Sequence, residues 1–71
     1  MSIYEKYLSL HKQANDLANK CDFENYKLKS EEEVEFRNEN FSKSDWEQLI
    51  AQSTGRAKYE YTRMMKERFP E

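Results

Sequence analysis

Few side chains in this sequence could bind a metal ion or act as a nucleophile. Apart from the methionines, the soft metal ligands are one histidine, His11, and one cysteine, Cys21. On one helix these two would lie about 15 Å apart along the axis, too far to share a metal ion. Neither has sequence neighbours that would complete a catalytic triad. We therefore expect no metal site and no catalytic residue, with Cys21 as a small core side chain and His11 as a packing residue.

Two further kinds of chemistry can be tested against the residue types. The acidic residues Glu31, Glu32, Glu33 and Glu35 could form a carboxylate site, but such catalysis needs a pocket that keeps one carboxyl group protonated. A helical chain of 71 residues has little room for that pocket. A phosphate-binding loop is excluded because Gly55 is the single glycine. The sequence therefore predicts neither an enzyme nor a cofactor.

Two apolar stripes at helical spacing are the elements that must position the remaining groups. Their members recur in steps of three and four residues, which is typical of amphipathic helices. The stripes are Ile3, Tyr7, Leu10, Ala14, Leu17 and Cys21, and then Trp46, Ile50, Ser53, Ala57, Tyr61 and Met64. Because two such helices can bury each other's stripes, we expect residues 3–21 to pack on residues 46–64.

Capping signals locate the ends of these two helices. Ser2 and Ser44 are each followed by a glutamate three residues later, the spacing of a capping box. The first helix is predicted over roughly 3–20, and the last from Ser44 to about Arg68, before Pro70. Gly55 weakens the last helix by about 1 kcal/mol relative to alanine, so the segment 53–55 is where it could kink or break.

Residues 22–41 fit two interpretations. As a helix, the segment uses Ser30 as N-cap and Glu33 as its reciprocal partner. As a β-hairpin, it pairs Tyr26 with Phe36 and Leu28 with Val34. The helix is favoured because glutamate is depleted in strands, and because loop 30–32 lacks the glycine or asparagine of short hairpins. The predicted fold is therefore all-α, a small helical hairpin or three-helix bundle in a single domain over 1–71. The alternative is α-β-β-α with a hairpin at about 24–38.

Composition and charge restrict the possible partners and compartments. Hydrophobic and charged residues each make up 37% of the chain, against usual values of about 45–50% and 25%. The core is therefore expected to be small and rich in tyrosine. A partner protein or a second copy of the chain would compensate for the shortage of apolar side chains. The net charge is −2, with an acidic middle and a mildly basic end. No apolar run approaches the ~20 residues of a membrane span, and the lone cysteine favours a reducing compartment, so we expect a cytoplasmic protein.

The surplus of aromatic and methionine side chains is the strongest functional hint. Tyr59 and Tyr61 lie about 200° apart on a helix, so one core face cannot take both. Interface cores are enriched in tyrosine, tryptophan, methionine and arginine. The sequence therefore predicts a non-enzymatic protein-binding module: a regulator, inhibitor or adaptor, of a size common among phage and bacterial accessory factors. The expected contact residues are Tyr59, Tyr61, Met65 and Phe69, with Glu31, Glu32 and Glu35 at the rim facing a partner with a basic surface. A second copy, giving a homodimer, is a further candidate partner.

The alternative function is nucleic-acid binding by the basic C-terminal segment. Its basic residues alternate with aromatic side chains on which bases could stack. The residues that would carry this function are Arg56, Lys58, Arg63 and Lys66. An acidic chain is not typical of nucleic-acid-binding domains, so protein binding is the favoured hypothesis.

Overall fold

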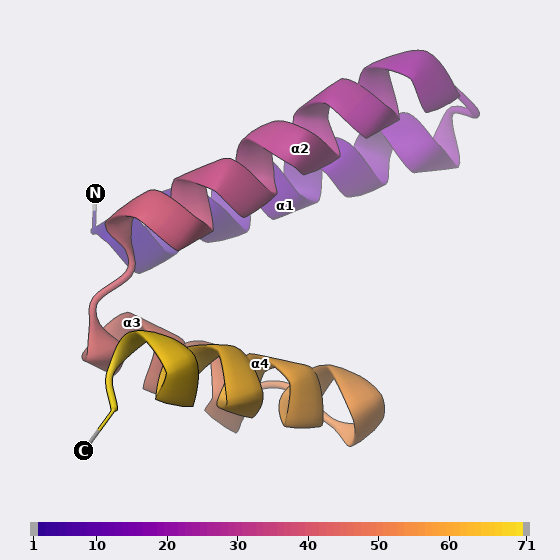
Figure 1. The fold of residues 1–71 in the computed structure, drawn as a ribbon. Helices are drawn as coiled ribbons and strands as arrows, with labels where there is room; N and C mark the ends of the chain where they lie inside the picture. The colour runs from indigo at the N-terminus through magenta and orange to yellow at the C-terminus, as the bar shows by residue number, and fades with distance from the viewer. Residues whose placement is uncertain (1, 71) are drawn as a thin grey trace. The chain divides into compact units, whose positions relative to one another are not determined.

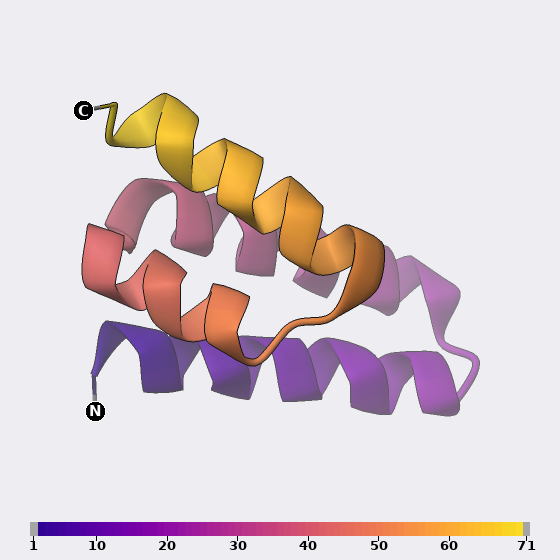
Figure 2. The ribbon, with the colours of Figure 1, turned by 90° about the horizontal axis from the view of Figure 1, so that it is seen from below.

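The computed structural model describes residues 2–70, which form four helices joined by short connections (Figures 1 and 2). Helix α1 spans Ile3–Asn19, α2 spans Phe23–Asn40, α3 spans Lys43–Ala51 and α4 spans Gly55–Arg68. No strand occurs among the described residues, so the all-α prediction is confirmed. The alternative β-hairpin at 24–38 is wrong, because α2 covers that whole segment.

The chain divides after Asn40 into two compact units, each a pair of helices. Helix α1 packs on α2 in the first unit, and α3 packs on α4 in the second. Each helix therefore finds a partner in the helix next to it in sequence. The packing of stripe 3–21 on stripe 46–64, and the single domain over 1–71, both stay predictions.

In the first unit, α1 and α2 lie side by side and run antiparallel (Figure 1). Helix α1 begins where the sequence predicts, with the Glu5 N–H donating to Ser2 Oγ at 3.1 Å. Its buried side chains recur at helical spacing and are Tyr4, Tyr7, Leu10 and Ala14. The two ends of the predicted stripe, Ile3 and Cys21, are exposed instead. The stripe is therefore correct in its middle and shifted at its ends.

The turn between α1 and α2 places Cys21 in the left-handed region, with φ of 60°. The Cys21 N–H donates to Ala18 O and the Asp22 N–H to Leu17 O, both at 3.0 Å. This pair of bonds is a Schellman motif, a common way to satisfy the last carbonyl groups of a helix. The chain leaves the helix at this point, so Cys21 is exposed and its expected role as a core side chain is wrong.

Asp22, rather than Ser30, caps the start of α2. Its carbonyl oxygen accepts from the Tyr26 N–H at 2.9 Å, and its carboxylate accepts from the Asn25 N–H at 3.4 Å. Aspartate is among the best N-cap residues because its side chain satisfies an otherwise unpaired N–H. Ser30 lies inside the helix, so its predicted N-cap role is wrong.

The second unit is a hairpin of α3 and α4, where the sequence predicts one helix over about 44–68. The break falls at residues 52–54, and Gly55 opens α4 with φ of +61°. Only glycine adopts this conformation without steric cost, so the chain reverses there instead of continuing as a helix. Helix α4 ends at Arg68, shortly before Pro70, as predicted.

The capping box of α3 lies two residues before the predicted one. Ser42 Oγ accepts from the Asp45 N–H at 3.3 Å, and Asp45 Oδ2 accepts from the Ser42 N–H at 3.0 Å. These reciprocal bonds satisfy two N–H groups at the start of the helix. Ser44 and Glu47 lie within α3, so the box predicted for them is wrong.

Trp46 belongs to the second unit, and none of its surface is exposed. The Phe41 ring meets it edge-on, with ring centroids 5.5 Å apart, and the Tyr61 ring lies 6.4 Å away on α4. The Arg68 guanidinium sits over the indole ring at 5.4 Å, within the range of a cation–π interaction. Aromatic contacts therefore join α3 to α4.

Candidate functional site

His11 takes part in packing between α1 and α2. Its Nδ1 lies 2.8 Å from Glu33 Oε1, and its ring stacks on Tyr7 with centroids 6.2 Å apart. The Glu33 carboxylate is almost fully buried and thus gains a polar partner across the helix pair. Within residues 2–70, no three histidine, cysteine, aspartate or glutamate side chains lie close enough together to hold a metal ion.

The three acidic rim residues lie on the exposed surface of α2. Glu31 and Glu35 flank Val34 around a shallow hollow, and the Glu32 carboxylate lies 3.0 Å from Lys29 Nζ. Val34 keeps 37% of its surface exposed. Two of the three expected rim residues, Glu31 and Glu35, therefore lie beside the apolar side chain of Val34.

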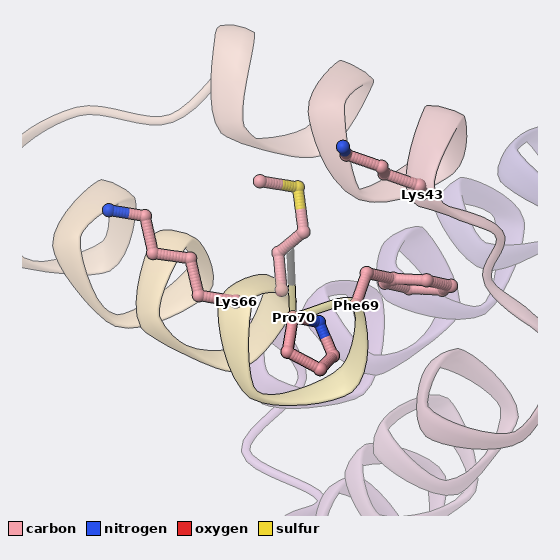
Figure 3. Close-up of a pocket in the computed structure, with 5 residues that line it drawn as sticks. Lys43, Lys66, Phe69 and Pro70 are labelled. Atoms are coloured by element: carbon pink, nitrogen blue, oxygen red, sulfur yellow. The ribbon is translucent and has the colours of Figure 1, made fainter.

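The C-terminal end of α4 forms a hollow of about 310 Å³ with the start of α3 (Figure 3). Met65 on α4 and Phe69, which directly follows the last residue of α4, line this hollow together with Lys43, Lys66 and Pro70. We call it the α4 hollow. In Figure 3, the Lys66 side chain lies at the left, and the Lys43 side chain lies at the upper right, above the Phe69 ring. The α4 hollow thus combines an apolar wall with two positive charges.

The two tyrosines of the predicted contact set have different surroundings. Tyr59 is 67% exposed and lines a second hollow with Thr62, Arg63 and Lys66. Tyr61 is half-buried against Trp46 and helps to hold α4 on α3. Because Lys66 lines both hollows, they are neighbours on the surface of α4. Tyr59, Met65 and Phe69 therefore lie on one surface, and Tyr61 belongs mainly to the interior of the unit.

The basic residues of α4 are not equally available to a partner. Arg56 Nε lies 3.6 Å from Glu60 Oε1, an ion pair one turn apart on the exposed surface. Arg63 and Lys66 have no carboxylate within ion-pair distance among residues 2–70, and both are exposed. Two of the four residues in the nucleic-acid hypothesis thus lie beside Tyr59, while Arg56 already has an acidic neighbour.

Sequence reasoning missed Lys43 and Pro70 as lining residues of the α4 hollow. Lys43 is on α3, and it reaches the hollow because the chain reverses at Gly55. A continuous helix from 44 to 68 would place residue 43 more than 30 Å from residue 66 along the axis. If the segment 53–55 had been interpreted as a turn, the sequence would have predicted Lys43 near the end of α4.

Comparison with protein-family models, curated proteins and solved structures finds no match for this chain. None of the helices formed by residues 2–70 has the length and apolar character needed to cross a membrane. The functional argument therefore depends on the surfaces described above.

Proposed function

We propose that this chain is a non-enzymatic protein-binding module that holds a segment of its partner in the α4 hollow. The observation that carries the proposal is that Met65 and Phe69 line one hollow beside two lysines. Methionine adapts its shape to a bound surface, and aromatic side chains are frequent at the energetic centre of interfaces. The volume of about 310 Å³ lies at the lower end of the range for ligand pockets. It suits a few side chains of a partner.

The other residues expected at the interface have supporting roles in this proposal. Tyr59 extends the contact surface along α4, next to Arg63 and Lys66. Glu31 and Glu35, on α2, would attract basic groups of the same partner and raise the association rate. In this role the protein acts as a regulator, inhibitor or adaptor. We place it in the cytoplasm, where a single free cysteine stays reduced.

A peptide library displayed on phage and panned against the full chain tests the proposal. Enriched peptides are expected to shift the backbone amide signals of Met65 and Phe69 in NMR spectra of the isotope-labelled chain. Phe69→Ala should weaken their binding about tenfold or more, because an aromatic anchor is lost. Phe23→Ala is the matched control, since Phe23 is an exposed phenylalanine in the first unit.

Two results would contradict the proposal. One is a library that yields no peptide bound at the α4 hollow. The other is a set of peptides that bind Phe69→Ala and the unaltered chain equally well. Far-UV circular dichroism of each variant ensures that a loss of binding does not reflect a loss of helical structure.

A further inference from the structure

The α4 hollow carries positive charge that the described part of the chain does not neutralise. Neither Lys43 nor Lys66 has a carboxylate within ion-pair distance among residues 2–70, and both are exposed. Arg63 adds a third cation on the adjoining surface, where it lines the second hollow together with Lys66. Exposed cations around an apolar pocket favour a negatively charged occupant through charge complementarity.

The lining of the hollow restricts the occupant further. Phe69, Pro70 and Met65 contribute apolar surface, and that surface is covered best by an apolar side chain. The hollow therefore combines this apolar surface with the ammonium groups of Lys43 and Lys66. An occupant that matches both kinds of lining residue carries an apolar group and a carboxylate close together.

A peptide fits this description better than a nucleic acid does. Nucleic-acid binding depends on many cations that follow the phosphate backbone, and only three lie around the two hollows among the described residues. The net charge of −2 would also repel a polyanion at long range. An acidic peptide needs just one or two carboxylates, and its side chains supply the apolar group as well.

We infer that the α4 hollow binds a short acidic peptide segment that carries one large apolar side chain. The apolar side chain packs against Phe69 and Met65, and flanking carboxylates pair with Lys43 and Lys66. The inference deepens the proposed function and rests on it, since it names the chemistry of the partner segment held in the same hollow.

Three synthetic peptides of equal length test this inference by NMR titration of the full chain. Each has a central leucine, flanked by aspartates in the first peptide, by asparagines in the second and by lysines in the third. The aspartate peptide should bind about tenfold more tightly than the asparagine peptide, because each flanking carboxylate gains an ion pair with an exposed lysine. Its binding should weaken as salt is added.

A charge-reversed variant provides a readout that unfolding cannot imitate. The double variant Lys43→Glu with Lys66→Glu should lose the preference for the aspartate peptide and bind the lysine peptide more tightly instead. The control variant, Lys12→Glu with Lys27→Glu, changes the net charge equally at two exposed lysines of the first unit. This control should keep the original preference.

Several results would overturn the inference. They are equal binding of the aspartate and asparagine peptides, a preference that survives in the double variant, and a preference that the control variant also loses. An oligonucleotide that displaces the aspartate peptide at equal concentration would overturn it in favour of nucleic acid. If library peptides bind through Phe69 but are neutral or basic, the inference falls and the proposed function stands.

Discussion

Four hydroxyl-bearing or charged side chains of the first unit are buried. Tyr4 and Tyr7 come from α1, and Glu33 and Arg37 come from α2. Two large apolar side chains of α2, Phe23 and Leu28, are each 64% exposed. Buried polar groups depend on specific partners, such as the His11 imidazole beside Glu33. Among these groups, burial of the Tyr4 hydroxyl should make the stability of this unit depend on pH.

Tyr4 gives this dependence a definite direction at alkaline pH. Burial raises the pKa of Tyr4 above its ordinary value of about 10. The folded state therefore holds the phenolic proton more tightly than the unfolded state does. The stabilisation is fully present below about pH 10 and is lost as the pH rises through the raised value.

We expect Tyr4→Phe to reduce the loss of unfolding free energy above about pH 10, because its ring has no proton to release. Urea unfolding followed by circular dichroism at a series of alkaline pH values measures this loss. Tyr59→Phe is the matched control, since Tyr59 is 67% exposed, and it should keep the pH dependence of the unaltered chain. Identical pH profiles for the two variants would show that burial of Tyr4 has no such effect.

At the scale of single helices, sequence reasoning succeeded where one signal acts alone. The first helix was predicted over 3–20 and spans Ile3–Asn19, because Ser2 caps it and nothing interrupts it before the turn. It failed where two signals compete. Ser30 and Ser44 have suitable spacings for N-caps, but Asp22 and Ser42 start their helices earlier in the chain. A side chain acts as a cap only at the point where the backbone enters the helix.

The substitution Gly55→Ala distinguishes a continuous last helix from a chain reversal at Gly55, because the two structures predict changes in stability of opposite sign. In an unbroken helix, Gly55→Ala would stabilise the chain by about 1 kcal/mol. With φ of +61°, alanine is instead expected to destabilise it by about 1–2 kcal/mol. An added Cβ would meet no neighbouring atom within 4 Å, so the effect comes from the backbone alone.

Thermal and urea unfolding of the variants measures this difference. Gly55→Asn should be intermediate, because asparagine enters the left-handed region more readily than alanine does. The expected order of stability is therefore glycine, asparagine and then alanine. A more stable alanine variant would support the continuous helix.

At the scale of the whole chain, the charge balance argues against nucleic acid as the partner. The chain carries a net charge of −2, and Arg56 on α4 already has an acidic neighbour in Glu60. We expect no measurable change in the fluorescence anisotropy of labelled single-stranded or duplex oligonucleotides at low salt. Tight binding that weakens steeply with salt, and that disappears when Arg56, Lys58, Arg63 and Lys66 become alanine, would contradict this expectation.

The candidate site could be predicted from the sequence only in the part that lies on one helix. Met65 lies in the last turn of α4 and Phe69 directly follows that helix, four residues later, so helical spacing predicts that they lie close together. Lys43 joins them through the reversal of the chain at Gly55, and no periodicity within α4 contains that information. Tyr61 was predicted both as a member of the apolar stripe and as a contact residue, and its contact with Trp46 depends on the same reversal.

Trp46 has a practical consequence for any study of this protein in solution. It is the single tryptophan of the chain, it is fully enclosed, and it belongs to the unit that contains the α4 hollow. Its intrinsic fluorescence therefore reports on that unit without a label or an engineered residue. The Arg68 guanidinium over the indole comes from the residue before Phe69. A ligand that moves the end of α4 would thus change the colour or intensity of the emitted light.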